Sequence, residues 1–357
     1  MKISISFTEF KKGMKELNNL KTKGTDQIES LENIIVKTVS KDNTIQLIKG
    51  SLISILQVNC FANIEQSGTI VLPSSTIKLI NSVKKGDKLT ITDKYIQIDS
   101  KKINFEYISI DTIPKLEFKS TIKKFEVTEK ELYRLLEVNY AVSKEDIRPV
   151  LTGINIKDNK FAALDGYRLS IRQSDQFNSD LNVTMSSEQW TVLLKLINKK
   201  SDGKICVYTN EKNAYLKFEI NNTLFESRLL DQEYIRYESI VPDVNDAGTK
   251  IEITDSEILD KLQLVSKLQA DKNVIVKLNI SDNIELKASD IHNTITDSID
   301  GTKEGSNLQI AFNVKYLLEY FKHCINKVNM YLYNSISPAL FTQDNKNIDI
   351  ILPVRLV

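Results

Sequence analysis

The sequence predicts an α+β fold of three similarly organised domains, each composed of two halves in which a helix accompanies antiparallel strands. One order of elements, a short strand followed by a helix and several alternating strands, occurs three times, at 68–111, 181–230 and 308–356. Each copy is preceded by another helix with its own strands, and these helices lie within 6–20, 128–142 and 255–268. Because domains of ~100–150 residues are the usual size, the repeat places the three domains at 1–120, 121–246 and 247–357.

The predicted helices begin at polar residues that can accept the first free backbone N–H groups. Ser74, Ser186 and Asn313 stand at such positions, each before an apolar stripe with helical spacing. Thr128, with Glu131 three residues later, matches a capping box. The strands that follow the helices alternate apolar and polar residues and are joined by short polar turns, as in 88–92 and 95–99.

Composition indicates an ordinary globular protein. The 357 residues are 41% hydrophobic and 27% charged, which is enough apolar material for packed cores. A run of about 18 apolar residues, as a membrane span requires, does not occur, and charges within the first 20 residues argue against a signal peptide. Three cysteines without a CxxC pair predict a reducing cytoplasm, with neither a disulfide framework nor a metal site.

Motifs for catalysis are missing from the sequence. Its two histidines, His292 and His323, have no second histidine at metal-ligand spacing, and we interpret them as a turn residue and a polar helix residue. The sequence contains no P-loop, GxGxxG or GxSxG pattern. Acidic groups at 129–131 and 255–257 stand at predicted helix starts, where carboxylates favour the helix dipole. We therefore predict a protein that is not an enzyme and needs no cofactor or metal.

The predicted helices have a basic outer face. In the first, Phe10, Met14 and Leu17 gather on one side, opposite the lysines. The six predicted helix ranges, 8–23, 74–85, 128–142, 186–200, 255–267 and 313–327, together carry a net charge of +8, whereas the whole chain carries +1. A basic helix face is often only a solvated face, but its restriction to one class of element favours contact with a polyanion. Aromatic residues do not interleave it, which favours contact with duplex phosphates rather than bases. The lysines concerned are Lys11, Lys12, Lys15, Lys23, Lys78, Lys85, Lys195, Lys199, Lys315 and Lys322.

Three segments, taken together, resemble the bacterial sliding clamp, the β subunit of DNA polymerase III. They are RPVLTGINI and LDGYRLSIR within 148–172, AFNVKYLLEYF at 311–321 and ILPVRL at 351–356, in the family's order and spacing. The internal threefold repeat, found without the resemblance, is also a property of this family. The resemblance implies a head-to-tail homodimer that closes a ring, with the helices lining a central hole. It further implies a replication processivity factor that encircles double-stranded DNA without sequence preference and tethers the polymerase.

The resemblance also implies a cleft for partner peptides between the second and third predicted domains. Aliphatic walls would receive the anchor side chains of the peptide, while Arg168 and Asn313 would bond its carbonyl groups. Tyr167 stands where the family usually has His, Ile235 where it usually has Pro, and Ser239 where some members have Arg, so the preferred peptide motif stays open. By motif, the cleft residues are Leu151, Leu164, Gly166, Tyr167, Arg168, Leu169, Ile240, Asn313, Tyr316, Ile336, Leu352, Pro353, Val354 and Arg355.

For the dimer, the resemblance implies contact between the first domain of one chain and the third domain of the other, through edge strands and an apolar patch. By motif, the patch is Ile103 and Phe105 against Leu264 and Val265. The implied partners are double-stranded DNA, a second copy of the chain, the replicative polymerase, the clamp-loader complex and other proteins with a clamp-binding motif. The implied location is the cytoplasm, at the nucleoid, with no role for a membrane.

Two functions of other classes compete with this prediction. The first is a clamp-fold DNA-binding adaptor that does not close a ring, which the mass in solution would distinguish. The second is a hydrolase using Asp165 and Arg168, which has little support because neither a nucleophile nor a base accompanies them. The first predicted domain is the most diverged, since KGSL at 49–52 stands where the family has TDLE. Whether such a clamp would serve a chromosome, a plasmid or a phage is left open by the sequence.

Overall fold

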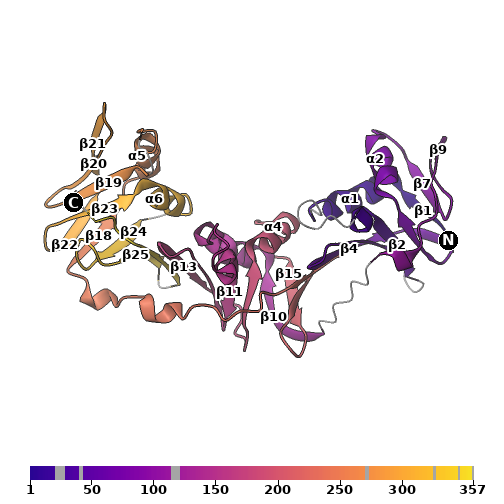
Figure 1. The fold of residues 1–357 in the computed structure, drawn as a ribbon, viewed down its shortest axis with the longest axis horizontal. Coiled ribbons are helices and arrows are strands. Elements are labelled where there is room, and N and C mark those ends of the chain that lie inside the picture. Colours follow the sequence, from indigo (N-terminus) through magenta and orange to yellow (C-terminus); the bar gives the residue numbers. More distant parts are fainter. Residues whose placement is uncertain are drawn as a thin grey trace. The chain divides into compact units, whose positions relative to one another are not determined.

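The computed structural model describes residues 1–20, 29–39, 43–113, 121–269, 273–324, 327–344 and 346–355. Over these residues the chain has the predicted α+β fold, with helices packed on antiparallel sheets (Figure 1). It divides into two compact units, Met1–Tyr133 with Glu188–Leu230 and Arg134–Ser187 with Asp231–Val357. The predicted boundaries at 120 and 246 are not the limits of these units. An eight-stranded sheet contains strands from both sides of residue 120, and a nine-stranded sheet contains strands from both sides of residue 246. The division into three domains stays a prediction.

The first unit contains a five-stranded sheet with strand order β5-β1-β7-β8-β9, so β5 and β9 are its edges. Alternating isoleucines and leucines of the inner strands are buried, as the period-two pattern predicts. Helices α1 (Phe7–Leu17) and α2 (Ser74–Ser82) follow β1 and β6 directly in the chain. The strands are β1 (Lys2–Ser6), β5 (Asn63–Gln66), β7 (Lys88–Thr92), β8 (Tyr95–Ile98) and β9 (Lys101–Asn104).

An eight-stranded sheet forms the rest of the first unit, in the order β10-β15-β16-β17-β4-β3-β2-β6. Helix α4 (Ser187–Leu196) packs on it through Trp190, whose ring meets Phe218 edge-on at 5.5 Å between centroids. Phe218 in turn stacks on Phe225 of the next strand at 6.2 Å. The strands are β2 (Ile34–Val39), β3 (Thr44–Gly50), β4 (Ser54–Phe61), β6 (Thr69–Leu72), β10 (Ile122–Thr128), β15 (Lys204–Thr209), β16 (Tyr215–Ile220) and β17 (Thr223–Arg228).

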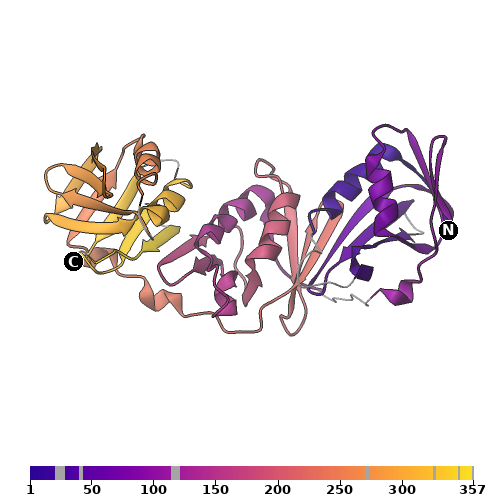
Figure 2. The same ribbon diagram turned by 45° about the horizontal axis from the view of Figure 1, so that its top comes forward.

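Helix α1 packs on the same face of the eight-stranded sheet as α4. Phe225 lies opposite Leu56 of β4, and Cys60, four residues further along β4, points to the same side because side chains alternate. Gly13 of α1 approaches this side so closely that a Cβ on it would lie 2.8 Å from the Cys60 sulfur, a contact that only glycine permits. The solvent-facing sides of α1 and α4 therefore lie over one face of this sheet (Figure 2).

The second unit contains a nine-stranded sheet with order β14-β11-β12-β13-β26-β25-β24-β18-β22 and a four-stranded sheet with order β21-β20-β19-β23. Its helices are α5 (Ile258–Val265) and α6 (Val314–Phe321), which pack against each other, and the 3₁₀ helix η3 (Leu136–Ala141), which follows α3 (Glu129–Leu135). The strands are β11 (Gly153–Lys157), β12 (Lys160–Leu164), β13 (Arg168–Gln173), β14 (Asn182–Ser186), β18 (Thr249–Ile253), β19 (Ile275–Ile280), β20 (Ile284–Ser289), β21 (Thr294–Ile299), β22 (Gly301–Gly305), β23 (Leu308–Asn313), β24 (Val328–Leu332), β25 (Ala339–Asp344) and β26 (Asn347–Ile351).

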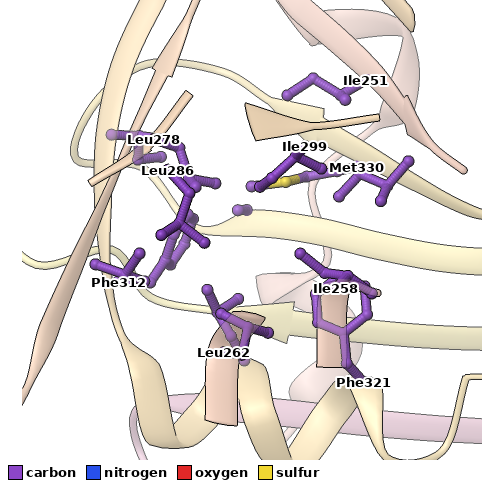
Figure 3. Close-up of a cluster of buried hydrophobic side chains, with 14 of the residues drawn as sticks. Ile251, Ile258, Leu262, Leu278, Leu286, Ile299, Phe312, Phe321 and Met330 are labelled. Atoms are coloured by element: carbon purple, nitrogen blue, oxygen red, sulfur yellow. The ribbon is translucent and has the colours of Figure 1, made fainter. Parts of the chain in front are cut away.

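A large apolar core holds α5 and α6 against strands of both sheets of the second unit (Figure 3). Leu262 of α5, Phe321 of α6 and Phe312 of β23 are each less than a tenth exposed in it. Burial of such a side chain stabilises the fold by ~1.5–3 kcal/mol. The core thereby fixes the start of α6, where Asn313 and Tyr316 of the predicted cleft lie.

The helix starts confirm two predicted caps and correct two, one of which is Ser186, whose hydroxyl has no hydrogen-bond partner among the described residues. The Thr128 hydroxyl accepts from the backbone N–H of Glu131 at 3.2 Å, and the Asn313 side chain accepts from a backbone N–H in the first turn of α6 at 3.0 Å. The prediction that Ser74 caps its helix is wrong. Ser74 is the first residue of α2, and its own N–H donates to Asn33 Oδ1 at 3.0 Å, so a residue distant in sequence supplies the acceptor.

Candidate partner-binding surface and basic helix faces

Most of the predicted cleft residues gather around one pair of strands in the second unit, but on opposite faces. Strands β13 and β26 pair with Leu169 opposite Ile350 and Ser170 opposite Asp349. Because side chains alternate along a strand, Leu169 points to one face and its neighbour Arg168 to the other. The predicted set therefore divides into an apolar group and a group centred on Arg168.

The apolar group has a buried floor and an exposed rim. Leu151, Leu164 and Leu169 belong to one hydrophobic cluster and are only 7%, 5% and 3% exposed. Ile240 ends the 3₁₀ helix Tyr237–Ile240, Leu352 directly follows β26, and the two are 47% and 37% exposed. Exposed aliphatic side chains beside a buried apolar floor suit the anchor residue of a partner peptide.

The C-terminal segment lies against the turn that precedes β13. Gly166 has φ +89°, a left-handed conformation that favours glycine. Asp165 Oδ1 accepts from the backbone N–H groups of Tyr167 and Arg168 at 3.0 and 3.1 Å. The backbone N–H of Leu352 then donates to the Tyr167 carbonyl at 2.9 Å, and that of Val354 donates to the Ala311 carbonyl at 2.7 Å. Three segments carry the family resemblance. The C-terminal one thus contacts both of the others, those at 148–172 and 311–321. Along this segment Pro353 is half-buried and Arg355 is exposed.

Arg168 already has partners within the chain. Its Nε donates to Asp165 Oδ2 at 3.1 Å, and its terminal nitrogen donates to the Glu319 carboxylate. The guanidinium lies over the rings of Tyr140 and Tyr316, 5.1 and 4.8 Å from their centroids. With its side chain 3% exposed, Arg168 is not a free donor, and the prediction that it bonds peptide carbonyls is wrong for this arrangement. Its role is to hold the surrounding aromatic rings in position.

Four further cleft residues differ in exposure. Tyr167, 59% exposed, stacks on Tyr316 with centroids 5.9 Å apart and planes 19° apart. Burial, followed by the nearby Asp165 carboxylate, raises the pKa of the Tyr316 hydroxyl. Asn313 uses its side-chain oxygen as the helix cap described above, and Ile336 is 58% exposed in the loop between β24 and β25.

A buried polar network beneath the Arg168 group was missed by the sequence analysis. Asp349 accepts from Arg172 at 2.8 Å and from the Tyr140 hydroxyl at 2.6 Å, and both charged side chains are at most 3% exposed. Burial alone would lower the pKa of Arg172, but the attraction of Asp349 outweighs it and keeps the guanidinium charged. His323 stacks on Tyr140 at 5.2 Å, and burial lowers its pKa. Two arginines on one face of a strand were the available signal, but the carboxylate that pairs with Arg172 lies on a strand distant in sequence.

The lysines predicted to contact DNA are exposed wherever the structure describes them, except Lys11. Lys11 donates to the backbone carbonyls of Asn81 and Val83 at 3.1 and 2.8 Å, so its ammonium group caps the end of α2. Lys11 is therefore not a free channel residue, contrary to the prediction. Lys23 lies outside the described residues. The exposed lysines are Lys12, Lys15, Lys78, Lys85, Lys195, Lys199, Lys315 and Lys322.

The predicted dimer residues differ in accessibility. Ile103 lies on the edge strand β9, and Phe105 follows it; both are half-buried. Leu264 is 58% exposed on α5, as a contact residue should be, whereas Val265 is 0% exposed in the core of its own unit. The prediction that Val265 faces a partner is wrong for this arrangement, because one step along a helix turns a side chain by about 100°.

The fold of the whole chain is that of solved sliding clamps. A DNA polymerase III beta subunit from Eubacterium rectale superimposes with a TM-score of 0.89 at 24% identity, covering 100% of both chains. A sliding clamp from Bartonella birtlesii, solved bound to griselimycin, has a TM-score of 0.86 at 22% identity over 100% of both chains. Together with the exposed basic helices, these likenesses define the class as a clamp fold.

Sequence comparison assigns the family. The family description "DNA polymerase III beta subunit, central domain" matches residues 126–235, and "DNA polymerase III beta subunit, C-terminal domain" matches residues 238–355. The beta sliding clamp of Staphylococcus aureus is 25% identical over 351 residues, covering 93% of this chain and 87% of that relative. The chain belongs to the DNA polymerase III beta subunit family, the bacterial sliding clamps. The alternative of a clamp-fold DNA-binding adaptor that does not close a ring is not favoured. In the part of the chain that the structure describes, no helix is long and apolar enough to cross a membrane.

Proposed function

We propose that this sliding clamp closes around duplex DNA as a head-to-tail homodimer and tethers the replicative polymerase and other clamp-binding proteins. It acts in the bacterial cytoplasm, is opened by a separate loader complex and catalyses no reaction itself. The observation that carries the proposal is the face shared by α1 and α4, where Lys12, Lys15 and Lys195 are exposed. Lysines gathered in this way contact phosphates of any sequence, which permits sliding.

The attachment of partners is proposed at the surface around the Leu151–Leu164–Leu169 floor. Ile240 and Leu352 provide exposed aliphatic contacts beside it. A short peptide with apolar anchors would bury these side chains and order few of its own residues, which suits exchange between partners.

The DNA part of the proposal is tested by reversing charges on the helix face. We expect the triple variant Lys12→Glu, Lys15→Glu and Lys195→Glu, once loaded on nicked circular DNA, to dissociate severalfold faster than the wild type. Its dependence on salt should also be shallower, by roughly one unit of log–log slope for each lost phosphate contact. Gel filtration of the loaded circles at several salt concentrations measures both quantities.

A matched control separates the helix face from net charge. Lys37 is exposed on β2, and its neighbour Val36 is buried on the helix side of the same sheet, so Lys37 points to the opposite face. Lys37→Glu should leave retention unchanged, whereas the single variant Lys12→Glu should shorten it. Equal effects of these two variants would contradict the assignment of the helix face to DNA.

A further inference from the structure

The side chains around Arg168 form a continuous series of contacts that ends at the protein surface. The Arg168 guanidinium lies over the rings of Tyr140 and Tyr316, 5.1 and 4.8 Å from their centroids. Tyr316 in turn stacks on Tyr167, with centroids 5.9 Å apart and planes 19° apart. Arg168 is buried and the rings of Tyr140 and Tyr316 are half-buried, whereas Tyr167 is 59% exposed. Tyr167 is therefore the accessible end of this series.

One face of the Tyr167 ring is open. The nearly parallel stack covers the face that is turned to Tyr316. Among the described residues, no other ring and no cation lies against the Tyr167 ring. The backbone of Tyr167 is fixed, because its N–H donates to Asp165 Oδ1 at 3.0 Å and its carbonyl accepts from the Leu352 N–H at 2.9 Å. A ring held in this way needs little further ordering when a partner binds to it.

The charges beside the stacked rings favour a cation as the group that covers this face. Burial has the largest effect on the pKa of the Tyr316 hydroxyl and raises it. The charged groups that act on the same hydroxyl are Asp165, Arg168 and Glu319. Arg168 is paired with both carboxylates, and two carboxylates with one guanidinium leave a net negative charge. A cation on the Tyr167 ring is attracted by this charge as well as by the ring itself.

A guanidinium suits this position better than an ammonium group does. It is planar, stacks on aromatic faces and is more weakly hydrated than an ammonium, so it loses less when water leaves the contact. The chain already uses this packing one step further in, where the Arg168 guanidinium lies over the Tyr316 ring. An arginine side chain of a partner would therefore repeat on Tyr167 a contact that the fold itself makes.

We propose that the open face of Tyr167 selects partner peptides that carry an arginine close to their apolar anchor. The arginine guanidinium lies on the Tyr167 ring, while the anchor contacts the apolar surface to which Leu352 belongs. A short peptide can reach both, because the backbones of Tyr167 and Leu352 are hydrogen-bonded to each other. This inference rests on the proposed function, since it assigns a preference to the proposed partner surface.

The test uses short synthetic peptides of glycine and serine with a Leu-Phe anchor, in which arginine is placed in turn at each other position. Isothermal titration calorimetry with the full-length protein gives the affinity of each peptide. We expect the best arginine peptide to bind roughly two- to fivefold more tightly than the same peptide with citrulline, which keeps the planar shape but lacks the charge. Lysine or phenylalanine at that position should bind more weakly than arginine.

Variants of the protein assign the preference to the ring. Tyr167→Leu should remove the difference between the arginine and citrulline peptides, whereas Tyr167→Phe, which keeps the ring, should retain it. Phe61→Leu is the matched control, because Phe61 is an aromatic residue 77% exposed in the first unit. It should bind both peptides as the wild type does.

The anchor peptide without arginine tests the proposed partner surface separately. If this peptide and all its arginine derivatives fail to bind, the partner surface itself is wrong, and the inference fails with it. Where the anchor peptide binds, three results would each overturn the inference alone: equal affinity for arginine and citrulline at every position, tighter binding of phenylalanine than of arginine, or a preference for arginine that persists in Tyr167→Leu.

Discussion

Two arginines of this clamp, Arg168 and Arg172, make contacts that their positions in the sequence did not predict. Arg168 and Arg172 stand four residues apart in a segment typical of the family. The structure gives Arg168 two carboxylates and two flanking rings, and gives Arg172 the buried carboxylate of Asp349. Both arginines therefore hold β13 to the elements packed on it, and the partner surface is left to aliphatic and aromatic side chains.

At this scale we predict that Asp349→Ala destabilises the fold by about 3–5 kcal/mol, because it leaves the Arg172 guanidinium buried without its counter-ion. Urea unfolding followed by circular dichroism measures the loss. Replacement of the exposed acid Glu211 by Ala should change the free energy of unfolding by less than about 0.5 kcal/mol. A loss below about 1 kcal/mol in Asp349→Ala would show that the pair does not support this sheet.

Among the elements, strand β26 and the segment after it connect several parts of the second unit. The strand pairs with β13 and β25, and the following residues bond to Tyr167 and Ala311. Deletion of 352–357 would therefore remove backbone bonds to Tyr167 and Ala311 as well as a wall of the partner surface. A side-chain substitution separates the two effects.

We predict that Leu352→Ser weakens binding of a clamp-binding peptide by roughly five- to thirtyfold, the effect expected for an interface residue of this size. Isothermal titration calorimetry measures the affinity. Ile291, 90% exposed in the loop between β20 and β21, provides the control, and Ile291→Ser should bind the peptide as the wild type does. Unchanged affinity in Leu352→Ser would remove the C-terminal segment from the proposed surface.

At the scale of the whole molecule, the proposed ring depends on a sheet edge and an exposed apolar side chain through which two chains would meet. Strand β9 is an edge of its sheet, and Leu264 exposes an apolar side chain on α5. Val265 must be left intact in any test, because a charge there would disrupt the core of its own unit. Leu264 alone is the informative position.

We predict that Leu264→Arg raises the dissociation constant of the dimer by at least ~100-fold, since it places a charge in an apolar contact. Light scattering should report the mass of one chain, 40.7 kDa, at concentrations where the wild type has twice that mass. Leu79→Arg is the control, because Leu79 is 54% exposed on α2 and lies outside the predicted contact. A dimeric Leu264→Arg variant would contradict the proposed interface.

The sequence by itself determined the α+β class, the repeated helix-and-strand halves, the caps at Thr128 and Asn313, and the exposure of most of the helix lysines. These properties depend on local spacing: alternation defines strands, a period of 3.6 defines helix faces, and a cap involves residues two or three apart. The family resemblance, carried by local motifs, also followed from the sequence and was confirmed by the comparisons.

Only the tertiary structure decided which polar groups meet. Lys11 caps the end of α2 because the carbonyls of Asn81 and Val83 lie beside it. Arg172 pairs with Asp349 of the neighbouring strand. Asn33 accepts from the backbone N–H of Ser74 at the start of α2. Long-range pairs of this kind depend on which elements, distant in sequence, become neighbours in the fold, and no local pattern specifies that.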